Sequence, residues 1–207
     1  QDITGNWGEF QGTRSRPAGA EPTLDFVFRN GTKMQCKAQA IDVARLLSDI
    51  KQFLKSNPKE LDWDRLNLSD VGYRLVMKGE DKYVGANAAE WDVALEPKSG
   101  HFDRRIQLKV PLVKTGAYLV TARMEDGNTS RILVWLADTA VVEKQGDRGS
   151  YYFVADAVTG QPIQGATVDF FGYQQRWQAN NTVTYDIRET TAQSDADGQV
   201  ALKAEQA

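Results

Sequence analysis

The clearest pattern in the chain is an alternation of apolar and polar residues on both sides of a turn, between Pro111 and Leu136. Ala117 to Ala122 alternates between two faces, Glu125 to Asn128 has turn composition, and Arg131 to Leu136 returns as an apolar strand. The stretch predicts two adjacent antiparallel strands of a β-sandwich. Such a strand pair is a scaffold, so function has to come from other residues or from membership of a larger assembly.

Alternation predicts further strands on both sides of this hairpin. Leu24 to Phe28 and Lys33 to Ala40 flank Asn30-Gly31, a dipeptide that favours a two-residue hairpin turn because both positions tolerate positive φ. The first domain is therefore expected to open with a β-hairpin. The other predicted strands span residues 73–76, 91–95, 105–110, 151–155, 167–171, 182–187 and 200–202.

One segment changes to a helical period. Between residues 41 and 54, apolar residues recur at three- and four-residue spacing with charges on the other face. They are Val43, Leu46, Leu47, Ile50, Phe53 and Leu54. Asn57-Pro58 ends this predicted helix, and a short helical or turn segment follows at 61–68. The apolar stripe is expected to pack on its own domain, and a partner-binding helix is the alternative.

The chain divides into three predicted parts. Residues 1–20 are rich in Gly, Pro, Ser, Arg and Thr and predict a linker or the tail of a preceding domain. Residues 21–139 predict a β-sandwich with a helical insertion at about 41–70, and residues 140–207 predict a second sandwich. No flexible linker separates the two. The second sandwich is expected to be truncated, because fewer strands follow Asp156 than the roughly seven that a sandwich has.

Composition narrows the classes of function. The 207 residues carry a net charge of −3, which gives no general attraction to nucleic acid or to anionic membranes. No apolar run reaches the length of a membrane-spanning helix. Cys36 is the only cysteine, so this chain holds neither a disulfide nor a thiolate metal cluster. Because Cys36 lies in an alternating run, we expect a buried thiol that acts as a small apolar residue.

Three sets of residues invite a chemical role, and each has a simpler interpretation. Glu80 and Asp81 belong to a charged turn in which no apolar pocket would separate their pKa values. His101, the only histidine, stands in a loop and cannot build a multi-histidine zinc site. Asp195 and Asp197 lack the further ligands of a calcium loop, so an Asp-Gly β-turn is preferred.

The segment from Tyr173 to Trp177 is aromatic and polar, and could face a ligand or cap the edge of the sandwich. No phosphate-binding loop, dinucleotide fingerprint or basic-aromatic surface is present. Asn30, Asn67 and Asn128 fit the N-glycosylation pattern, which has meaning only in a source that glycosylates. The sequence predicts no catalytic, cofactor-binding or metal-binding residue.

Two parts of the chain together resemble the macroglobulin domains of bacterial α2-macroglobulin-like proteins. The first is PLVKTGAYLVTARMEDGNTSRILVWLADTAVV, and the second is YYFVADAVTGQPIQGATVDFFGY together with SDADGQVAL. The predicted helix after Ala40 looks like the helical insertion that some bacterial members carry in an early macroglobulin domain. The resemblance covers residues 21 to 207, and implies a mainly β fold with two tandem antiparallel sandwiches of the fibronectin or immunoglobulin type.

The resemblance also implies a function without catalysis. Members of this family are extracytoplasmic protease traps, which change conformation when a protease cleaves a bait segment, and many capture the protease through a thioester. This chain shows no bait segment, and Cys36 is followed by Lys37-Ala38-Gln39 where the thioester motif has Gly-Glu-Gln. A framework role is therefore expected, with neighbouring macroglobulin domains as direct partners and target proteases reached through the full-length protein.

Two other classes of function stay open. A cell-surface adhesion or carbohydrate-binding module is suggested by the Thr-Gly-x-Pro pattern at residues 159–162 and by Trp177 beside Tyr173. A hydrolase is disfavoured, because no nucleophile, base and orienting group assemble at any visible spacing. The residues beyond position 207 would distinguish the protease-trap framework from the adhesion module. Further macroglobulin repeats would favour the framework, and sugar-binding or anchoring modules would favour the adhesion module.

Overall fold

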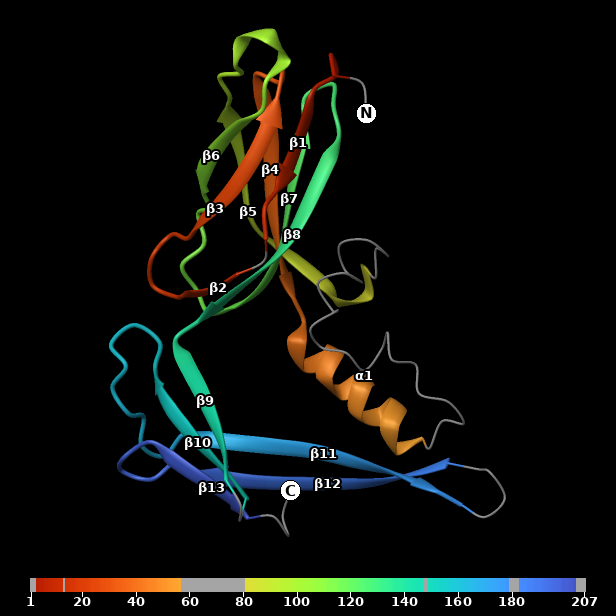
Figure 1. Ribbon diagram of the computed structural model, residues 1–207, viewed down its shortest axis with the longest axis vertical. Coiled ribbons are helices and arrows are strands. Elements are labelled where there is room, and N and C mark those ends of the chain that lie inside the picture. The colour runs from red at the N-terminus through yellow and green to blue at the C-terminus, as the bar shows by residue number, and fades with distance from the viewer. Residues whose placement is uncertain (1–2, 13, 57–80, 147–148, 179–182, 204–207) are drawn as a thin grey trace. The chain divides into compact units, whose positions relative to one another are not determined.

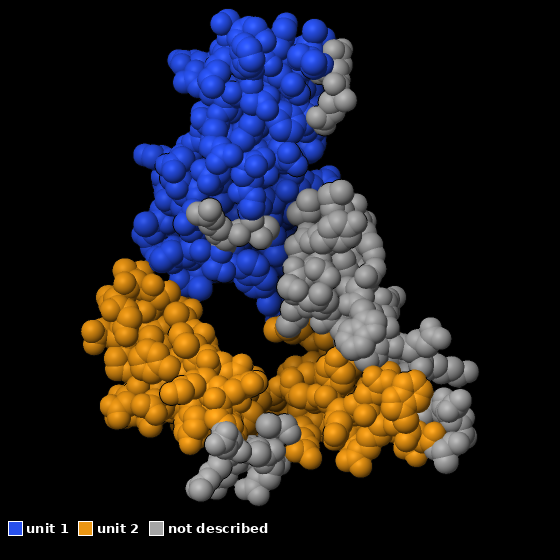
Figure 2. Space-filling model, in the orientation of Figure 1, with its two compact units in different colours: residues 1–46, 67–137 blue, residues 47–66, 138–207 orange. Residues whose placement is uncertain are grey.

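The computed structural model describes residues 3–12, 14–56, 81–146, 149–178 and 183–203, and these are mainly β-strands, as predicted (Figure 1). The chain divides into two compact units, coloured in Figure 2. Unit 1 comprises residues 1–46 and 67–137, and unit 2 comprises residues 47–66 and 138–207. Only Asp138 separates the last strand of unit 1 from the first strand of unit 2, so no flexible linker lies at this boundary.

Unit 1 is a sandwich of two sheets. Its strands are β1 (Trp7–Phe10), β2 (Arg14–Pro17), β3 (Thr23–Arg29), β4 (Lys33–Ile41), β5 (Val84–Ala94), β6 (Arg104–Lys109), β7 (Gly116–Met124) and β8 (Thr129–Ala137). One sheet has the order β1-β3-β6, and the other has the order β2-β8-β7-β4-β5. The predicted central hairpin is confirmed as β7 and β8, which pair antiparallel across the turn at residues 125–128.

The core of unit 1 lies between the two sheets. Phe26 and Phe28 of β3 face Met34 of β4 and Val120 of β7 in one hydrophobic cluster, and all four side chains are fully buried. Burial alternates along β3, as it should for a strand with one face on the core. Cys36 is 3% exposed and belongs to this cluster, which confirms the predicted buried thiol.

The predicted hairpin at Asn30-Gly31 is wrong, because β3 and β4 belong to different sheets. A two-residue hairpin turn of type I′ needs positive φ at both central residues, and of the two only Asn30 has it, at 64°. The chain instead bends across the core, so that the apolar faces of β3 and β4 pack against each other. Asn-Gly indicates only that the backbone can turn sharply at this point. A hairpin within one sheet and a crossing between two sheets both need such a turn, so the dipeptide does not distinguish them.

The N-terminal segment also differs from prediction, since residues within the expected linker 1–20 form two strands. β1 pairs antiparallel with β3 in one sheet, and β2 pairs parallel with β8 in the other. Gly12, with φ of 68°, lies between the two strands. Both strands are short and only Phe10 is a buried large side chain, so alternation was too brief to distinguish them from a linker.

The predicted helix is confirmed as α1 (Val43–Lys55). Asp42 caps it, because its Oδ1 accepts the backbone N–H of Arg45 at 3.0 Å. Leu46 and Leu54 are buried, whereas Leu47, assigned to the same apolar stripe, is 39% exposed. The segments predicted at 61–68 and 73–76, most of the insertion at 41–70 that follows α1, and Glu80 lie outside the described residues. Of the helices in the described part, none combines the length and apolar character that crossing a membrane requires.

Unit 2 contains two smaller sheets in its described part. Its strands are β9 (Thr139–Gly146), β10 (Gly149–Asp156), β11 (Thr167–Trp177), β12 (Val183–Gln193) and β13 (Gln199–Lys203). One sheet has the order β13-β10-β9, and β11 and β12 form a separate ribbon. The residues of α1 that belong to unit 2 meet this ribbon, where Lys51 lies over the ring of Phe171 and Lys55 forms an ion pair with Glu189.

Candidate functional site

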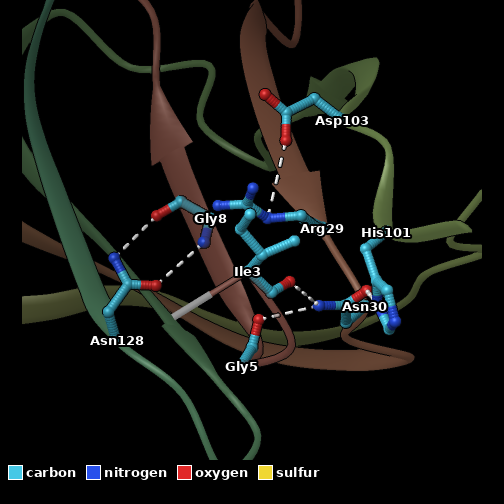
Figure 3. A network of polar contacts seen from close by, with 8 residues as sticks. All are labelled: Ile3, Gly5, Gly8, Arg29, Asn30, His101, Asp103 and Asn128. Atoms are coloured by element: carbon cyan, nitrogen blue, oxygen red, sulfur yellow. Dashed lines mark hydrogen bonds and ion pairs between the residues drawn. The ribbon is translucent and has the colours of Figure 1, made fainter. Parts of the chain in front are cut away.

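A network of polar contacts between distant segments lies at one end of unit 1, where the N-terminal segment passes the ends of several strands (Figure 3). Asn30 follows β3, Asn128 precedes β8, and His101 closes a short 3-10 helix, η4 (Ser99–His101), before β6. Asn30 and Asn128 bind the backbone of residues 3–8, and His101 contacts the side chain of Asn30. The site therefore gathers the only histidine and two asparagines that the sequence analysis considered separately.

Asn30 is the centre of one half of this network. Its side-chain Nδ2 donates to the carbonyl oxygens of Ile3 and Gly5, both at 2.9 Å. Its Oδ1 lies 2.8 Å from Nδ1 of His101. Because a side-chain amide oxygen can only accept, Nδ1 of His101 must carry the proton in this contact. The positive φ of Asn30 is one that asparagine adopts more readily than most residues.

Asn128 is the centre of the other half. Its side-chain amide binds the backbone of β1, the edge strand of its sheet, as a neighbouring strand would. The Gly8 N–H donates to Oδ1 of Asn128 at 2.8 Å, and Nδ2 of Asn128 donates to the Gly8 carbonyl at 2.9 Å (Figure 3). The next residue pair continues the pattern, since the Phe10 N–H donates to Oγ of Ser130 at 3.1 Å. Side chains of the β7–β8 hairpin thus bind the backbone of β1, which belongs to the opposite sheet.

Charged groups add a weaker contact beside these amides. Arg29 Nε lies 3.7 Å from Oδ1 of Asp103, and the guanidinium of Arg29 lies 5.7 Å from the ring centre of Trp7. Asp103 is largely exposed, so solvent screens the ion pair and its contribution to stability is small. The network as a whole holds the N-terminal segment to the sandwich. Its polar groups bind one another and the backbone.

The other predicted positions lie away from this network. Burial, reinforced by the charge of Asp92, raises the pKa of the Cys36 thiol to about 12, so the thiol stays neutral and unreactive in the folded state. Asp195 forms the predicted β-turn, because its Oδ1 accepts the N–H groups of Asp197 and Gln199. Asp81 begins a short 3-10 helix, η3 (Asp81–Tyr83). Within the described residues, no three metal-binding side chains come together.

A surface hollow of about 560 Å³ lies over the five-stranded sheet of unit 1. Its charged lining alternates in sign, with Lys37 opposite Glu90 and Arg123 on the same cross-strand row as Asp92. Asp92 is already paired with Lys33 at 3.1 Å. Alternating charges across neighbouring strands are typical of a solvated sheet face, where opposite signs stabilise the pairing.

The aromatic segment from Tyr173 to Trp177 belongs to strand β11 and not to a loop. Its neighbour in register is β12, and the ring of Tyr173 packs edge-on against Tyr185 at 6.3 Å between ring centres. Arg176 forms an ion pair with Asp186 on the same strand pair. Of the two aromatic residues that suggested a sugar-binding surface, Tyr173 therefore packs within the ribbon, whereas Trp177 is 71% exposed.

Comparison with known proteins places the fold. No protein-family model matches the chain, and no curated protein matches it by sequence. Native α2-macroglobulin from Escherichia coli spanning domains NIE-MG1 matches with a TM-score of 0.57 and 16% identity, over 97% of this chain and 88% of that one. The same protein spanning MG0-NIE-MG1 matches with equal score and identity, over 96% and 57%. A mutant Salmonella α2-macroglobulin matches at 0.52 and 16% identity, over 96% of this chain and 10% of its own.

These matches confirm the resemblance at the level of the fold. The chain has the arrangement of strands and helix found in this part of bacterial α2-macroglobulins, and it spans about a tenth of the length of the Salmonella chain.

Proposed function

We propose that this chain forms framework domains of a bacterial α2-macroglobulin-like protease inhibitor, and that it carries out no chemistry of its own. The observation that carries the proposal is the structural match over 97% of this chain and 88% of the NIE-MG1 structure from Escherichia coli. A match over both units supports more than a shared sandwich topology, because a single β-sandwich recurs in many unrelated proteins. An extracytoplasmic location and further macroglobulin domains as neighbours belong to the same proposal.

The geometry of the polar network supports a framework role. The side chains of Asn30 and Asn128 satisfy backbone groups of a neighbouring strand, and Nδ1 of His101 is used to hold Asn30. A hydrolytic site that works by covalent catalysis needs a nucleophile, a base and a group that orients the base within hydrogen-bond reach. The network instead fixes the N-terminal segment to the body of unit 1.

The proposal is tested on the parent protein that contains this chain. The protein is incubated with trypsin, and the residual protease activity is measured on a large substrate, casein, and on a small chromogenic peptide. A trap lowers cleavage of casein while leaving cleavage of the small peptide, because the enclosed active site still admits small molecules. The isolated 207-residue chain serves as control and is expected to inhibit neither reaction.

Equal inhibition of both substrates would indicate an active-site inhibitor, and no inhibition with a panel of serine, cysteine and metalloproteases would remove the trap proposal. Binding of glycans by the parent protein would favour the adhesion alternative instead.

A further inference from the structure

We propose that Asn30–Gly31 is a site of spontaneous deamidation, locked by the docked N-terminal segment and opened when that segment is released. Asparagine followed by glycine is the pair in which a backbone nitrogen reaches the side-chain amide with the least steric hindrance, because glycine has no Cβ. In this protein both sides of the Asn30 amide are engaged by specific groups. The proposal is independent of the function proposed above.

The reaction needs no partner except water. The backbone nitrogen of Gly31 attacks Cγ of Asn30, a bond forms between them, and the bond from Cγ to Nδ2 breaks. The proton of the Gly31 N–H is lost and Nδ2 leaves as ammonia, giving a cyclic imide. Water then opens the ring at either carbonyl, so the product is aspartate or isoaspartate at position 30.

Two restraints oppose this reaction, and the docked segment supplies the first of them. The leaving nitrogen, Nδ2, is held by the carbonyls of Ile3 and Gly5, which fix the orientation of the amide. The attacking nitrogen is also engaged, because the N–H of Gly31 donates to the carbonyl of Arg29 at 2.8 Å and Gly31 is buried. Both restraints keep the side chain away from the cyclic geometry of the intermediate.

Release of residues 3–8 removes one restraint and leaves an activating group in place. Nδ1–H of His101 donates to Oδ1 of Asn30 from η4, which is not part of the N-terminal segment. A donor aimed at the carbonyl oxygen stabilises the negative charge that develops there during attack on Cγ. The open state therefore combines a free Nδ2 with a polarised carbonyl.

The product prevents the segment from returning. A carboxylate at position 30 has no N–H to donate, and it would face the carbonyl oxygens of Ile3 and Gly5 with a negative charge. His101 would pair with the new carboxylate and hold it in place. Deamidation thus converts a transient opening of the N-terminal segment into a permanent one.

The experiment compares deamidation in the wild-type chain and in Asn128→Ala, which removes both hydrogen bonds to Gly8 and leaves every contact of Asn30 intact. Purified proteins are kept at pH 8 and 37 °C, and the mass gain of the peptide containing Asn30 is followed with time. We expect the loss of two hydrogen bonds to raise the open population and the rate about tenfold. Asn87–Ala88, in strand β5 of the same protein, is the internal control.

Ser130→Ala, which removes one bond to Phe10, is the second variant if circular dichroism shows that Asn128→Ala is unfolded. Adding His101→Phe to the looser variant should slow the reaction several-fold. Asn30→Asp imitates the product, and hydrogen exchange should then show lost protection at Gly8 but not at Val120. Equal rates in wild type and in the looser variant, a wild-type rate equal to that of an unstructured peptide, or retained protection at Gly8 in Asn30→Asp would overturn the proposal.

Discussion

Replacing Gly8 by alanine tests whether β1 is packed against the core of unit 1. A Cβ at Gly8 would lie 2.5 and 2.7 Å from two ring carbons of Phe26, and 2.9 Å from the sulfur of Met124. Carbon atoms in contact prefer a separation of about 3.5–4.0 Å. The ring of Phe26, the side chain of Met124 or strand β1 must therefore shift by about 1 Å. Phe26 and Met124 are 0% and 1% exposed, so neither can turn toward solvent.

The expected magnitude follows from two opposing effects. Overpacking of this kind costs about 1–3 kcal/mol of stability. Replacing a strand glycine by alanine stabilises the fold by about 0.5–1 kcal/mol, because alanine lowers the conformational entropy of the unfolded chain. We therefore expect Gly8→Ala to lower the free energy of unfolding of unit 1 by about 1–2 kcal/mol. Gly172→Ala, in β11, is the matched control, because a Cβ there meets nothing within 4 Å and the change should be neutral or stabilising.

Urea unfolding followed by tryptophan fluorescence measures the effect, since Trp7, Trp91 and Trp135 all lie in unit 1. The substitution Phe26→Leu removes the two closest ring atoms, so Gly8→Ala should cost less in that background than in the wild type. A Gly8→Ala variant as stable as the wild type, with no coupling to Phe26, would show that β1 does not pack on the core as described.

Three further predictions concern the helix, a turn and the thiol. Asp42→Ala removes the cap on the Arg45 N–H and should destabilise α1 by about 1 kcal/mol, measured by circular dichroism during urea unfolding. Hydrogen bonds from Thr159 and from the N–H of Val158 hold the pKa of Asp156 below its usual value. The turn therefore gains stability above the unfolded pKa of about 3.9 and loses it as pH falls through the lower folded pKa. Carbon-13 NMR titration should find that low pKa, and Thr159→Val should raise it. Cys36, with its pKa raised to about 12, should react with a disulfide reagent at pH 8 only as fast as the protein unfolds.

Strands with a long alternating pattern were predictable because their pairing is local. β7 and β8 are adjacent in sequence, and the turn between them has residues that suit it. The same holds for α1, whose apolar period and preceding Asp42 define its start. In each case the period of the apolar residues agrees with the turn or cap at the end of the element, and agreement across these levels is what makes a sequence specify one local structure.

Pairing between distant segments was not predictable in the same way. β1 and β2 have partners in β3 and β8, and the partner of β2 lies 120 residues away in sequence. Their short strands carry little alternation, so nothing local distinguishes them from a linker. Asn30-Gly31 gave the opposite error, since a strong local turn signal was assigned to a hairpin while the chain crosses between sheets.

The polar network was missed for a related physical reason. Asn128 has the composition of a turn residue, and its sequence gives no sign that its amide would pair with Gly8, 120 residues earlier. Asparagine was visible as a turn former, but the partner of its amide depends on where the N-terminal segment runs. The sequence placed His101 in a loop, and its side chain is exposed, while its contact with Asn30 depends on the same tertiary path.

The N-terminal segment explains why this network is built from amides. By moving from β3 to β8, the segment adds a strand to each sheet on one side of the sandwich, where the edge strands would otherwise present unpaired backbone groups. Backbone donors and acceptors that leave one ladder before entering the next need partners, and an asparagine side chain offers one donor group and one acceptor in the geometry of a peptide. Asn128 supplies both to Gly8, and Asn30 supplies donors to Ile3 and Gly5. These two asparagine side chains therefore complete the sandwich, which is a structural role of the kind proposed for a framework domain.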